Sequence, residues 1–400
     1  MLIGIPKEIF TGEKRVAAIP MTIGKYIDLG FDVAVESSAG EGIFISNDEY
    51  EFAGAKLFPD AESLFAESDV ILKVNQPGFD ERIQKHEVKM LRNGSILISF
   101  LHPALPENHE IIRQLQDKNI TAFAMDSIPS IPRARKMEAQ SSMNVVTGYK
   151  AVIMAANQMP RFVPMIGTAN GTIEPAQFLV IGTGVVGLQA IATAKLLGGV
   201  VKALDISENA CLEAERLGAE IIQFYSPQEL AVGKEGYMSS LDGEWLEIEQ
   251  NIIAPHLEDA DVVILSAQIP GEVAPILVTE QMISTMKPGS VIMDISVGNG
   301  NNCEVTEPGQ IIQRLGIYVF GIKNIPGMMA MDASLLFAEN MYYFVENLFK
   351  NGVGKIDLKD EIVKSCLITH GGKILHRLTL KALALREASL HMDMVVNQGV

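Results

Sequence analysis

The sequence contains few cysteines, no long apolar run and no cluster of metal-ligand residues. Its three cysteines, Cys211, Cys303 and Cys366, lie far apart, which favours reduced thiols in a cytosolic protein over a disulfide framework. Histidines, cysteines and acidic residues nowhere share the spacing of a ligand set, so we expect no metal. No apolar stretch approaches the roughly 20 residues that span a bilayer, and the chain opens on a strand-like "LIGIP". We therefore expect no signal peptide and no direct membrane insertion.

Basic residues are also scarce. Lysine and arginine number 32 against 49 aspartate and glutamate residues, which gives a formal net charge of −17. Such a negative chain disfavours a nucleic acid or an anionic lipid surface as a partner. The composition, 48% apolar and 20% charged, is that of a soluble globular protein, and 400 residues exceed what one core usually holds. Two domains are therefore expected.

Short apolar runs alternate with amphipathic stretches through most of the chain. In residues 1–126 the runs "LIGIP", "FDVAVES", "DVILKV", "SILISFL" and "ITAFAM" are typical of buried strands, and a second series, from "QFLVIG" to "IYVFGI", occupies residues 177–326. Strands that alternate with helices predict parallel sheets covered on both faces. The helix candidates at 333–350 and 379–392 build no sheet alone, so we expect the tail to return to the first domain.

The strongest local motif is "QFLVIGTGVVGLQAIATAKLLGGVVKALD". A predicted strand leads into Gly182, Gly184 and Gly187, a helix follows, and the next strand ends on Asp205. The first glycine permits a tight turn, the second lets the backbone approach a pyrophosphate at the helix N-terminus, and the third lets the helix pack on the strand. Asp205 stands where a carboxylate accepts hydrogen bonds from the adenosine ribose and would repel a 2′-phosphate. The motif therefore predicts binding of NAD rather than NADP.

These patterns together predict the fold class and the domain organisation. The class is α/β, with two Rossmann-like doubly wound parallel-sheet domains and an NAD cleft between them. We expect the first domain to comprise residues 1–140 together with 331–400, and the NAD-binding Rossmann domain to comprise residues 141–330.

Several motifs, taken in order along the chain, resemble a known family. They are "IGIPKE", "EKRVAAIP", "VILKVNQP", "GTGVVGLQAIATAKLLG", "IPGEVAPILVT", "MKPGSVIMDIS" and "NNCEVTEPG". They resemble the soluble NAD(H)-binding component, at the start of the alpha subunit, of the proton-translocating nicotinamide nucleotide transhydrogenases, to which alanine dehydrogenase is related with the same fold. The resemblance covers nearly the whole chain apart from its C-terminal end.

The resemblance implies an activity, a cofactor and partners. In this family the component binds NADH and passes a hydride directly to NADP⁺ held on a second domain, while a membrane domain couples that step to proton movement. We therefore expect NAD as the cofactor, and membrane and NADP(H)-binding transhydrogenase subunits as partners. A homodimer is also expected, located in the cytoplasm and associated with the inner membrane through the partner subunits.

The stretch "PSIPRARKMEAQSSMN" resembles the nicotinamide loop of the family but departs from its usual residues. Arg133 and Ser141 match, whereas Ser130, Arg135 and Glu138 replace an arginine, a glutamine and an aspartate. Ser130 is too short to pair with Glu138, but Arg135 can rebuild that pair. The fixed charge of Arg135 would favour the neutral ring of NADH where the two nicotinamides meet, which puts the rate of transfer in question. The resemblance makes Arg135, Glu138 and Ser141 the residues nearest the reaction.

The same resemblance carries over a wider set of cofactor-binding residues. Those in the nicotinamide loop are Ser130, Arg133, Arg135, Lys136, Met137, Glu138 and Ser141. Those in and after the glycine turn are Gly182, Thr183, Gly184, Val185, Gly187, Asp205, Ile206 and Ser207, and those further on are Gly236, Gln250 and Gln268. Gly236 and Tyr237 lie in a segment that resembles the family's mobile loop, which makes Tyr237 a candidate lid residue.

Two alternatives remain open. Arg15, Lys73 and His102 match three residues with which alanine dehydrogenases hold the oxo-acid and transfer a proton during oxidative deamination of L-alanine. Gly298 stands where those enzymes have an aspartate, and a glycine cannot act as a general base. Arg15 and Lys73 also occur in transhydrogenases, and ion pairing within the first domain explains them equally well. The other alternative is an NAD-binding protein without turnover, which the altered loop suits, as does Glu272 in place of the usual lysine.

Overall fold

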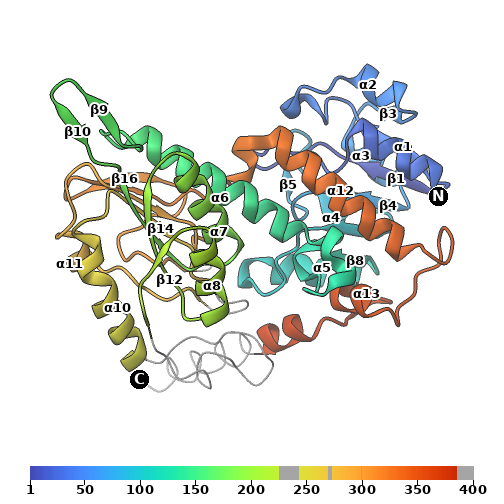
Figure 1. Ribbon diagram of the computed structural model, residues 1–400. Helices are drawn as coiled ribbons and strands as arrows, with labels where there is room; N and C mark the ends of the chain where they lie inside the picture. Colours follow the sequence, from blue (N-terminus) through green and yellow to red (C-terminus); the bar gives the residue numbers. More distant parts are fainter. Residues whose placement is uncertain (225–242, 269–272, 299, 385–400) are drawn as a thin grey trace. The chain divides into compact units, whose positions relative to one another are not determined.

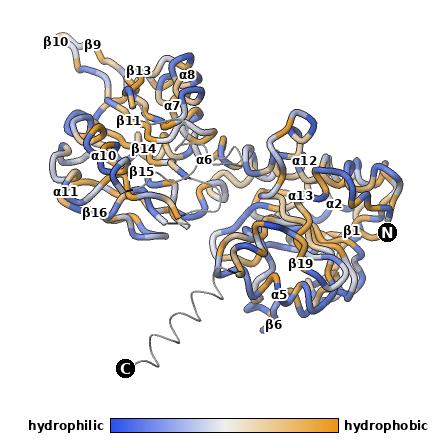
Figure 2. The backbone as a smooth tube through the Cα atoms, turned by 90° about the horizontal axis from the view of Figure 1, so that it is seen from below, coloured by the Kyte–Doolittle hydropathy of each residue, from blue (hydrophilic) through white to orange (hydrophobic). Residues whose placement is uncertain are grey.

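The computed structural model describes residues 1–224, 243–268, 273–298 and 300–384, in two compact units (Figure 1). Unit 1 comprises Met1–Met143 and Gly327–Val400, and unit 2 comprises Asn144–Pro326. Within each unit the apolar residues gather along the central strands (Figure 2). None of the described helices combines the length and the apolarity that crossing a membrane requires.

Unit 1 is built on an eight-stranded sheet in the order β19–β18–β8–β7–β4–β1–β2–β3. The strands are β1 (Leu2–Ile5), β2 (Asp32–Glu36), β3 (Lys56–Phe58), β4 (Val70–Leu72), β7 (Ile96–Ser99), β8 (Thr121–Ala124), β18 (Leu367–His370) and β19 (Lys373–Ile374). The strands from β1 to β8 in this sheet pair in parallel. β18 pairs antiparallel with β8, and β19 antiparallel with β18, so the C-terminal segment completes a sheet begun by the N-terminal one.

Helices flank this sheet. They are α1 (Pro20–Asp28), α2 (Asn47–Phe52), α3 (Ala61–Glu67), α4 (Glu87–Met90), α5 (His109–Asp117), α12 (Ala330–Leu348) and α13 (Glu361–Cys366), with the 3-10 helices η1 (Glu41–Ile43), η2 (Pro106–Asn108), η3 (Met125–Ser127) and η4 (Pro132–Met137) and a small hairpin of β5 (Phe79–Asp80) and β6 (Lys85–His86). Along α12, Phe337, Met341 and Phe344 are buried at three- and four-residue spacing, which places them on one face. The ring of Phe344 meets that of Phe123 in β8 edge-on and fixes α12 to the sheet.

Unit 2 is built on a seven-stranded sheet in the order β13–β12–β11–β14–β15–β17–β16. The strands are β11 (Gln177–Ile181), β12 (Val200–Leu204), β13 (Glu220–Ile221), β14 (Val262–Leu265), β15 (Val291–Asp294), β16 (Ile311–Arg314) and β17 (Ile317–Phe320), and β9 (Ile166–Thr168) and β10 (Gly171–Ile173) form a separate hairpin. All neighbours in the sheet are parallel except β16 and β17. The parallel strands follow the order of a dinucleotide-binding Rossmann fold.

Helices cover both faces of the second sheet. They are α6 (Ala139–Gln158), which begins in the last residues of the first unit, α7 (Val185–Leu196), α8 (Glu208–Arg216), α10 (Gly243–Leu257) and α11 (Glu280–Ile283), with η5 (Pro326–Met329) at the end of the unit. Phe178 and Val180 of β11 belong to the apolar cluster of α6 and α7, whereas Leu179 and Ile181 belong to that of α10. Successive side chains of a strand point to opposite faces, so the sheet is covered on both sides.

The predicted α/β class with two Rossmann-like domains is confirmed, as are the strands quoted from both series. The sheets differ from the prediction at their edges, where β16, β18 and β19 run antiparallel. Of the C-terminal helix predicted at 379–392, residues up to 384 are helical, in a helix that begins at residue 377, and the remainder lies outside the described residues.

Candidate functional site

Each glycine of the turn after β11 has its own steric reason. Gly182 has a φ of +85°, and a Cβ there would lie 2.7 Å from the backbone nitrogen of Ala267. A Cβ on Gly187, in the first turn of α7, would lie 2.0 Å from the carbonyl oxygen of Gly182. Gly184, by contrast, has no atom within 4 Å of an added Cβ. The turn is close-packed at the outer glycines and open at the middle one, as a backbone that approaches a ligand requires.

The open glycine is also the start of α7. Gly184 is the N-cap of this helix, and no side chain caps it there. The first amide groups of an α-helix lack an intrahelical partner and carry the positive end of the helix dipole. Val185, at the first helical position, is 38% exposed, so the end of the helix is accessible. This geometry can hold a pyrophosphate.

Asp205 follows β12 and is tied to the same turn. Its Oδ2 accepts hydrogen bonds from the backbone nitrogen (2.6 Å) and the hydroxyl (3.2 Å) of Thr183, and its Oδ1 accepts one from the backbone nitrogen of Ser207 (2.8 Å). Ser207 in turn caps α8 by accepting from the backbone nitrogen of Ala210, and Ile206 beside it is half-buried. A carboxylate oxygen can accept more than one hydrogen bond, so Asp205 is held in place and remains able to bind a ribose hydroxyl.

A second acid, which the sequence reasoning missed, influences the same place. Glu249 is 5% exposed and lies on the face of α10 that also buries Ile253 and Leu257. Burial, and then the charge of Asp205, raise the pKa of Glu249 to about 7. The sequence does carry a signal for it, because an acid four residues before Ile253 interrupts an apolar helical stripe.

Polar residues cross-link the loops after β14 and β15. The buried carboxylate of Asp294 accepts from the backbone nitrogens of Asn302 (3.1 Å) and Cys303 (3.0 Å) and from the hydroxyl of Thr306 (2.8 Å). The side chain of Asn302 accepts from the backbone nitrogen of Ala267 and donates to its carbonyl oxygen, both at 3.0 Å. Sequence reasoning did not single out these residues, because a buried aspartate and asparagine after a strand carry no distinctive spacing.

Two predicted cofactor residues in this region have partners within the protein. Gln250 donates to the carbonyl oxygen of Ile276 (2.7 Å), and Gln268 donates to that of Ile295 (3.3 Å). Gly298 has a φ of +120°, a conformation that side chains rarely adopt. The predicted residues Gly236, Tyr237 and Glu272 lie outside the described part of the chain.

The cationic segment forms the 3-10 helix η4, which is attached to the C-terminal elements of unit 1. Arg133 donates to the carboxylates of Asp360 (2.8 Å) and Glu361 (3.2 Å). The carbonyl oxygen of Lys136 accepts from the side chain of Asn340 in α12 (2.8 Å). Two of the three cations of the segment are therefore engaged in holding it.

The remaining residues of the segment divide into buried and exposed. Met137 is buried, whereas Ser130 and Arg135 are exposed. Glu138 accepts a hydrogen bond from the hydroxyl of Ser141 (3.0 Å). The pairing of Arg135 with Glu138 that the sequence suggested is not formed, and Arg135 has no ion pair or hydrogen-bond partner among the described residues.

Of the positions shared with alanine dehydrogenase, Lys73 is fully buried in an ion-pair cluster. Its Nζ lies 2.7 Å from Oε1 of Glu87 and 3.7 Å from Oε2 of Glu8, and both carboxylates are buried as well. Burial alone would lower the pKa of Lys73, but the charges of Glu8 and Glu87 outweigh it and raise the pKa. Lys73 is therefore a charged structural group with its ammonium already bound.

Arg15 is also paired, and a cavity lies beside it. Its Nε and Nη2 donate to the two carboxylate oxygens of Glu13 at 2.8 Å and 2.6 Å. Burial would raise the pKa of Glu13, but the hydrogen bonds and charge of Arg15 lower it to about 2. A cavity of about 210 Å³ in this unit is lined by Lys7, Glu8, Glu13, Lys14, Arg15, Ala39, Glu41 and Gly42.

His102 follows β7 in an unusual backbone conformation. Its φ is +43°, which few residues with a side chain adopt. Its ring stacks on Phe100 with the centroids 5.6 Å apart, and Nδ1 lies 3.8 Å from Oδ2 of Asp126. The ring is thus oriented by two neighbours and remains partly exposed.

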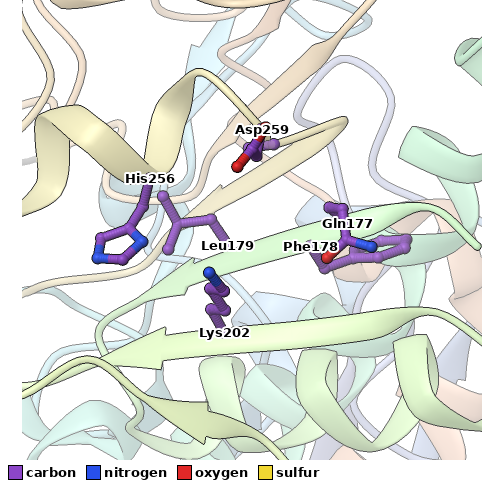
Figure 3. Close-up of a pocket in the computed structure, with 7 residues that line it drawn as sticks. Gln177, Phe178, Leu179, Lys202, His256 and Asp259 are labelled. Atoms are coloured by element: carbon purple, nitrogen blue, oxygen red, sulfur yellow. The ribbon is translucent and has the colours of Figure 1, made fainter.

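A second cavity, lined by α10 and the strands of unit 2, is too small for a nucleotide. Figure 3 presents its lining residues, Gln177, Phe178, Leu179, Lys202, His256, Asp259 and Ala260. Its volume of about 10 Å³ holds at most a water molecule. Gln177 begins β11 and Gly182 follows its end, so the cavity and the glycine turn lie at opposite ends of that strand.

Comparison with known proteins extends over both units. The family described as "Alanine dehydrogenase/PNT, N-terminal domain" matches residues 4–147, and "Alanine dehydrogenase/PNT, C-terminal domain" matches residues 151–377. The first of the separately encoded portions of NAD(P) transhydrogenase subunit alpha in Rhodospirillum rubrum is 39% identical over 381 residues, which cover 94% of this chain and 98% of that protein. The crystal structure of a transhydrogenase from Sinorhizobium meliloti is similar with a TM-score of 0.81 at 38% identity, covering 94% of this chain and 100% of that one. An alanine dehydrogenase of Halomonas elongata is 30% identical over 394 residues, 96% of this chain and 97% of that protein. The resemblance inferred from the motifs is confirmed.

Proposed function

Because the chain belongs to the alanine dehydrogenase/PNT family, we propose that it is the NAD(H)-binding component of a proton-translocating nicotinamide nucleotide transhydrogenase. Similarity to transhydrogenase alpha subunits over nearly the whole chain supports this assignment, and membership of the family implies an oxidoreductase. The observation that carries the proposal is the hydrogen bond that joins the glycine turn to Asp205 in unit 2.

The proposal assigns each portion of the dinucleotide to residues with suitable chemistry. The pyrophosphate lies at the N-terminus of α7, over Gly184, where the backbone is open. Asp205 accepts hydrogen bonds from the adenosine ribose, and Glu249 adds a second carboxyl group that the charge of Asp205 reaches. Because carboxylates repel a 2′-phosphate, NADH is preferred over NADPH. The segment 130–141 then serves the nicotinamide end.

The bound cofactor supplies the hydride chemistry. A hydride, with its electron pair, leaves NADH, which becomes NAD⁺, and it reduces NADP⁺ on the partner domain to NADPH without a proton from solvent. The side chains of this chain need provide no general acid or base for that step. Their task is to fix the ring of NADH, to present it to the partner and to exclude water.

The partners belong to the same proposal. The words "subunit alpha" in the names of the relatives imply further subunits in those proteins, and we extend them to this chain as an NADP(H)-binding and a membrane subunit that couples transfer to proton translocation. The location would be cytoplasmic, at the inner membrane through these subunits. A homodimer is proposed through exposed elements of unit 2, such as the β9–β10 hairpin, in which β10 is exposed throughout. Sedimentation that finds only monomer at micromolar concentration would contradict the dimer.

Alanine dehydrogenase is the second candidate, favoured by the cavity of about 210 Å³ beside Arg15. Against it, the guanidinium of Arg15 and the ammonium of Lys73 are each bound to a buried carboxylate, and Gly298 offers no carboxylate. An NAD-binding protein without turnover is the third candidate, and the exposed charge of Arg135 is the feature that suits it.

Two assays on the isolated chain separate these candidates. NADH and NADPH are titrated separately and binding is followed by the fluorescence of the reduced nicotinamide. NAD with L-alanine is then tested for NADH formation. The proposal predicts tight binding of NADH, weak binding of NADPH and no alanine-dependent reduction of NAD. Alanine-dependent NADH formation that His102→Ala abolishes would establish the second candidate instead.

A further inference from the structure

A single carboxylate from the C-terminal segment holds the cationic segment of unit 1. Oδ2 of Asp360 accepts from Nη1 of Arg133 (2.8 Å) and from Nζ of Lys350 (2.6 Å). Arg133 reaches Glu361 as well, at 3.2 Å. The side chain of Asp360 is only 4% exposed, so water does not replace these bonds easily. Hydrogen bonds between a carboxylate and two cations are among the stronger polar contacts in proteins.

The other oxygen of Asp360 has a separate structural role. Oδ1 caps α13 by accepting from the backbone nitrogens of Ile362 (3.0 Å) and Val363 (3.3 Å). Burial would raise the pKa of Asp360, but Arg133, Lys350 and the cap bonds outweigh it and hold the pKa below its usual range. One side chain therefore joins the start of α13 to the cationic segment.

A second attachment lies three residues further along η4. The carbonyl oxygen of Lys136 accepts from Asn340 (2.8 Å), and its ammonium lies 4.7 Å from the ring centroid of Tyr343. Both partners belong to α12. The backbone on each side of Arg135 is thus fixed, while the Arg135 side chain has no partner among the described residues and is exposed.

We propose that Asp360 is a positioning residue for the nicotinamide end of the cofactor, which acts by holding Arg133 and thereby fixing η4 so that Arg135 is presented in one place. This inference rests on the proposed function, and it reassigns Arg133 from a cofactor contact to a member of the clamp. A rigid η4 lowers the conformational entropy lost when Arg135 meets the nicotinamide ring. The adenosine end is served by unit 2 and does not depend on the clamp.

The test uses Asp360→Asn in the full-length chain. Asparagine keeps an oxygen that caps α13 but removes the charge that binds Arg133 and Lys350. NADH and ADP-ribose, which lacks the nicotinamide ring, are titrated against the wild type and the variant by calorimetry. We expect NADH to bind about fivefold to tenfold more weakly in the variant while the affinity for ADP-ribose is unchanged. Asp60→Asn, which alters the matching N-cap of α3, is the control and should change neither affinity.

A second variant protects the test against a folding defect of α13. Arg133→Gln removes the cation and leaves the cap intact, and it should give the same selective loss. The double variant should lose no more NADH affinity than either single variant, because both act through one ion pair. Hydrogen exchange of the amides in 134–137 should accelerate in both variants.

The outcomes separate the two proposals. If the wild type binds neither NADH nor ADP-ribose, the proposed function fails, and hydrogen exchange alone then judges the clamp. If the wild type binds both ligands and the variants lose neither, or lose both equally, the positioning role of Asp360 is overturned. Slow exchange in 134–137 of both variants would also overturn it.

Discussion

The backbone nitrogen of Thr183 donates a hydrogen bond of 2.6 Å to Oδ2 of Asp205. This contact joins two ends of one Rossmann unit, the turn after β11 and the residue after β12. The carboxylate therefore has two tasks, to order the turn and to bind the ribose. Any substitution of Asp205 acts on both, and the choice of variant decides which task is measured.

Asp205→Ala is expected to weaken NADH binding by at least about tenfold, because a charged acceptor for the ribose hydroxyls is lost. NADPH binding should weaken less, so the preference between the two cofactors narrows. Asp205→Asn keeps an acceptor for Thr183 and serves as the matched variant, with a smaller loss of NADH affinity. Fluorescence titration measures both ratios. An unchanged preference in Asp205→Ala would remove Asp205 from the ribose site.

Glu87→Gln is expected to destabilise the protein by about 3–5 kcal/mol, because it leaves the buried ammonium of Lys73 with a weaker partner. Glu62→Gln breaks an exposed ion pair with Lys85 in the same unit and should cost less than about 1 kcal/mol. Urea unfolding of the two variants and the wild type makes the comparison. Equal effects would mean that the buried pair contributes no more than a surface one.

Glu249→Gln is expected to change the pH dependence of stability. The unfolded carboxyl ionises near the ordinary pKa of 4.5, whereas the folded one stays protonated until about pH 7. Unfolding therefore releases a proton between these values, and the free energy of unfolding falls as the pH rises through that window. The variant has no such slope and should be more stable than the wild type at pH 8 by up to about 3 kcal/mol. The exposed Glu247→Gln on the same helix is the control. Parallel stability curves for wild type and Glu249→Gln would contradict the raised pKa.

Arg135→Gln is expected to speed hydride transfer to a partner domain by roughly threefold to tenfold, because a fixed cation disfavours the positive charge that develops on the ring of NADH. NADH should bind somewhat less tightly in the same variant. Lys355→Gln removes an exposed cation elsewhere in unit 1 and controls for net charge. Single-turnover kinetics separate transfer from binding. A slower variant would mean that Arg135 holds the carboxamide rather than opposing the reaction.

The features of this molecule that the sequence predicts are those whose determinants are local. The glycine turn and Asp205 lie within one strand, turn and helix, so spacing alone indicates their chemistry, and the steric contacts of Gly182 and Gly187 agree with it. The clamp on η4 was not predicted, because Arg133 and Asp360 are separated by 227 residues. The antiparallel pairing of β18 also depends on a distant strand, β8, which supplies its hydrogen bonds. Lys73 illustrates the same limit, since its motif could not reveal that Glu8 and Glu87 surround it.

Direct hydride transfer between two dinucleotides is the central claim of the proposed function. The measurement is a reconstitution of this chain with a cognate NADP(H)-binding domain, NADP⁺ and NADH that carries deuterium at the transferable position of the nicotinamide. We predict that the NADPH formed contains the deuterium without loss to solvent, and that omission of either protein stops the reaction. Formation of NADPH without this chain, or wash-out of the label into water, would contradict the proposed function.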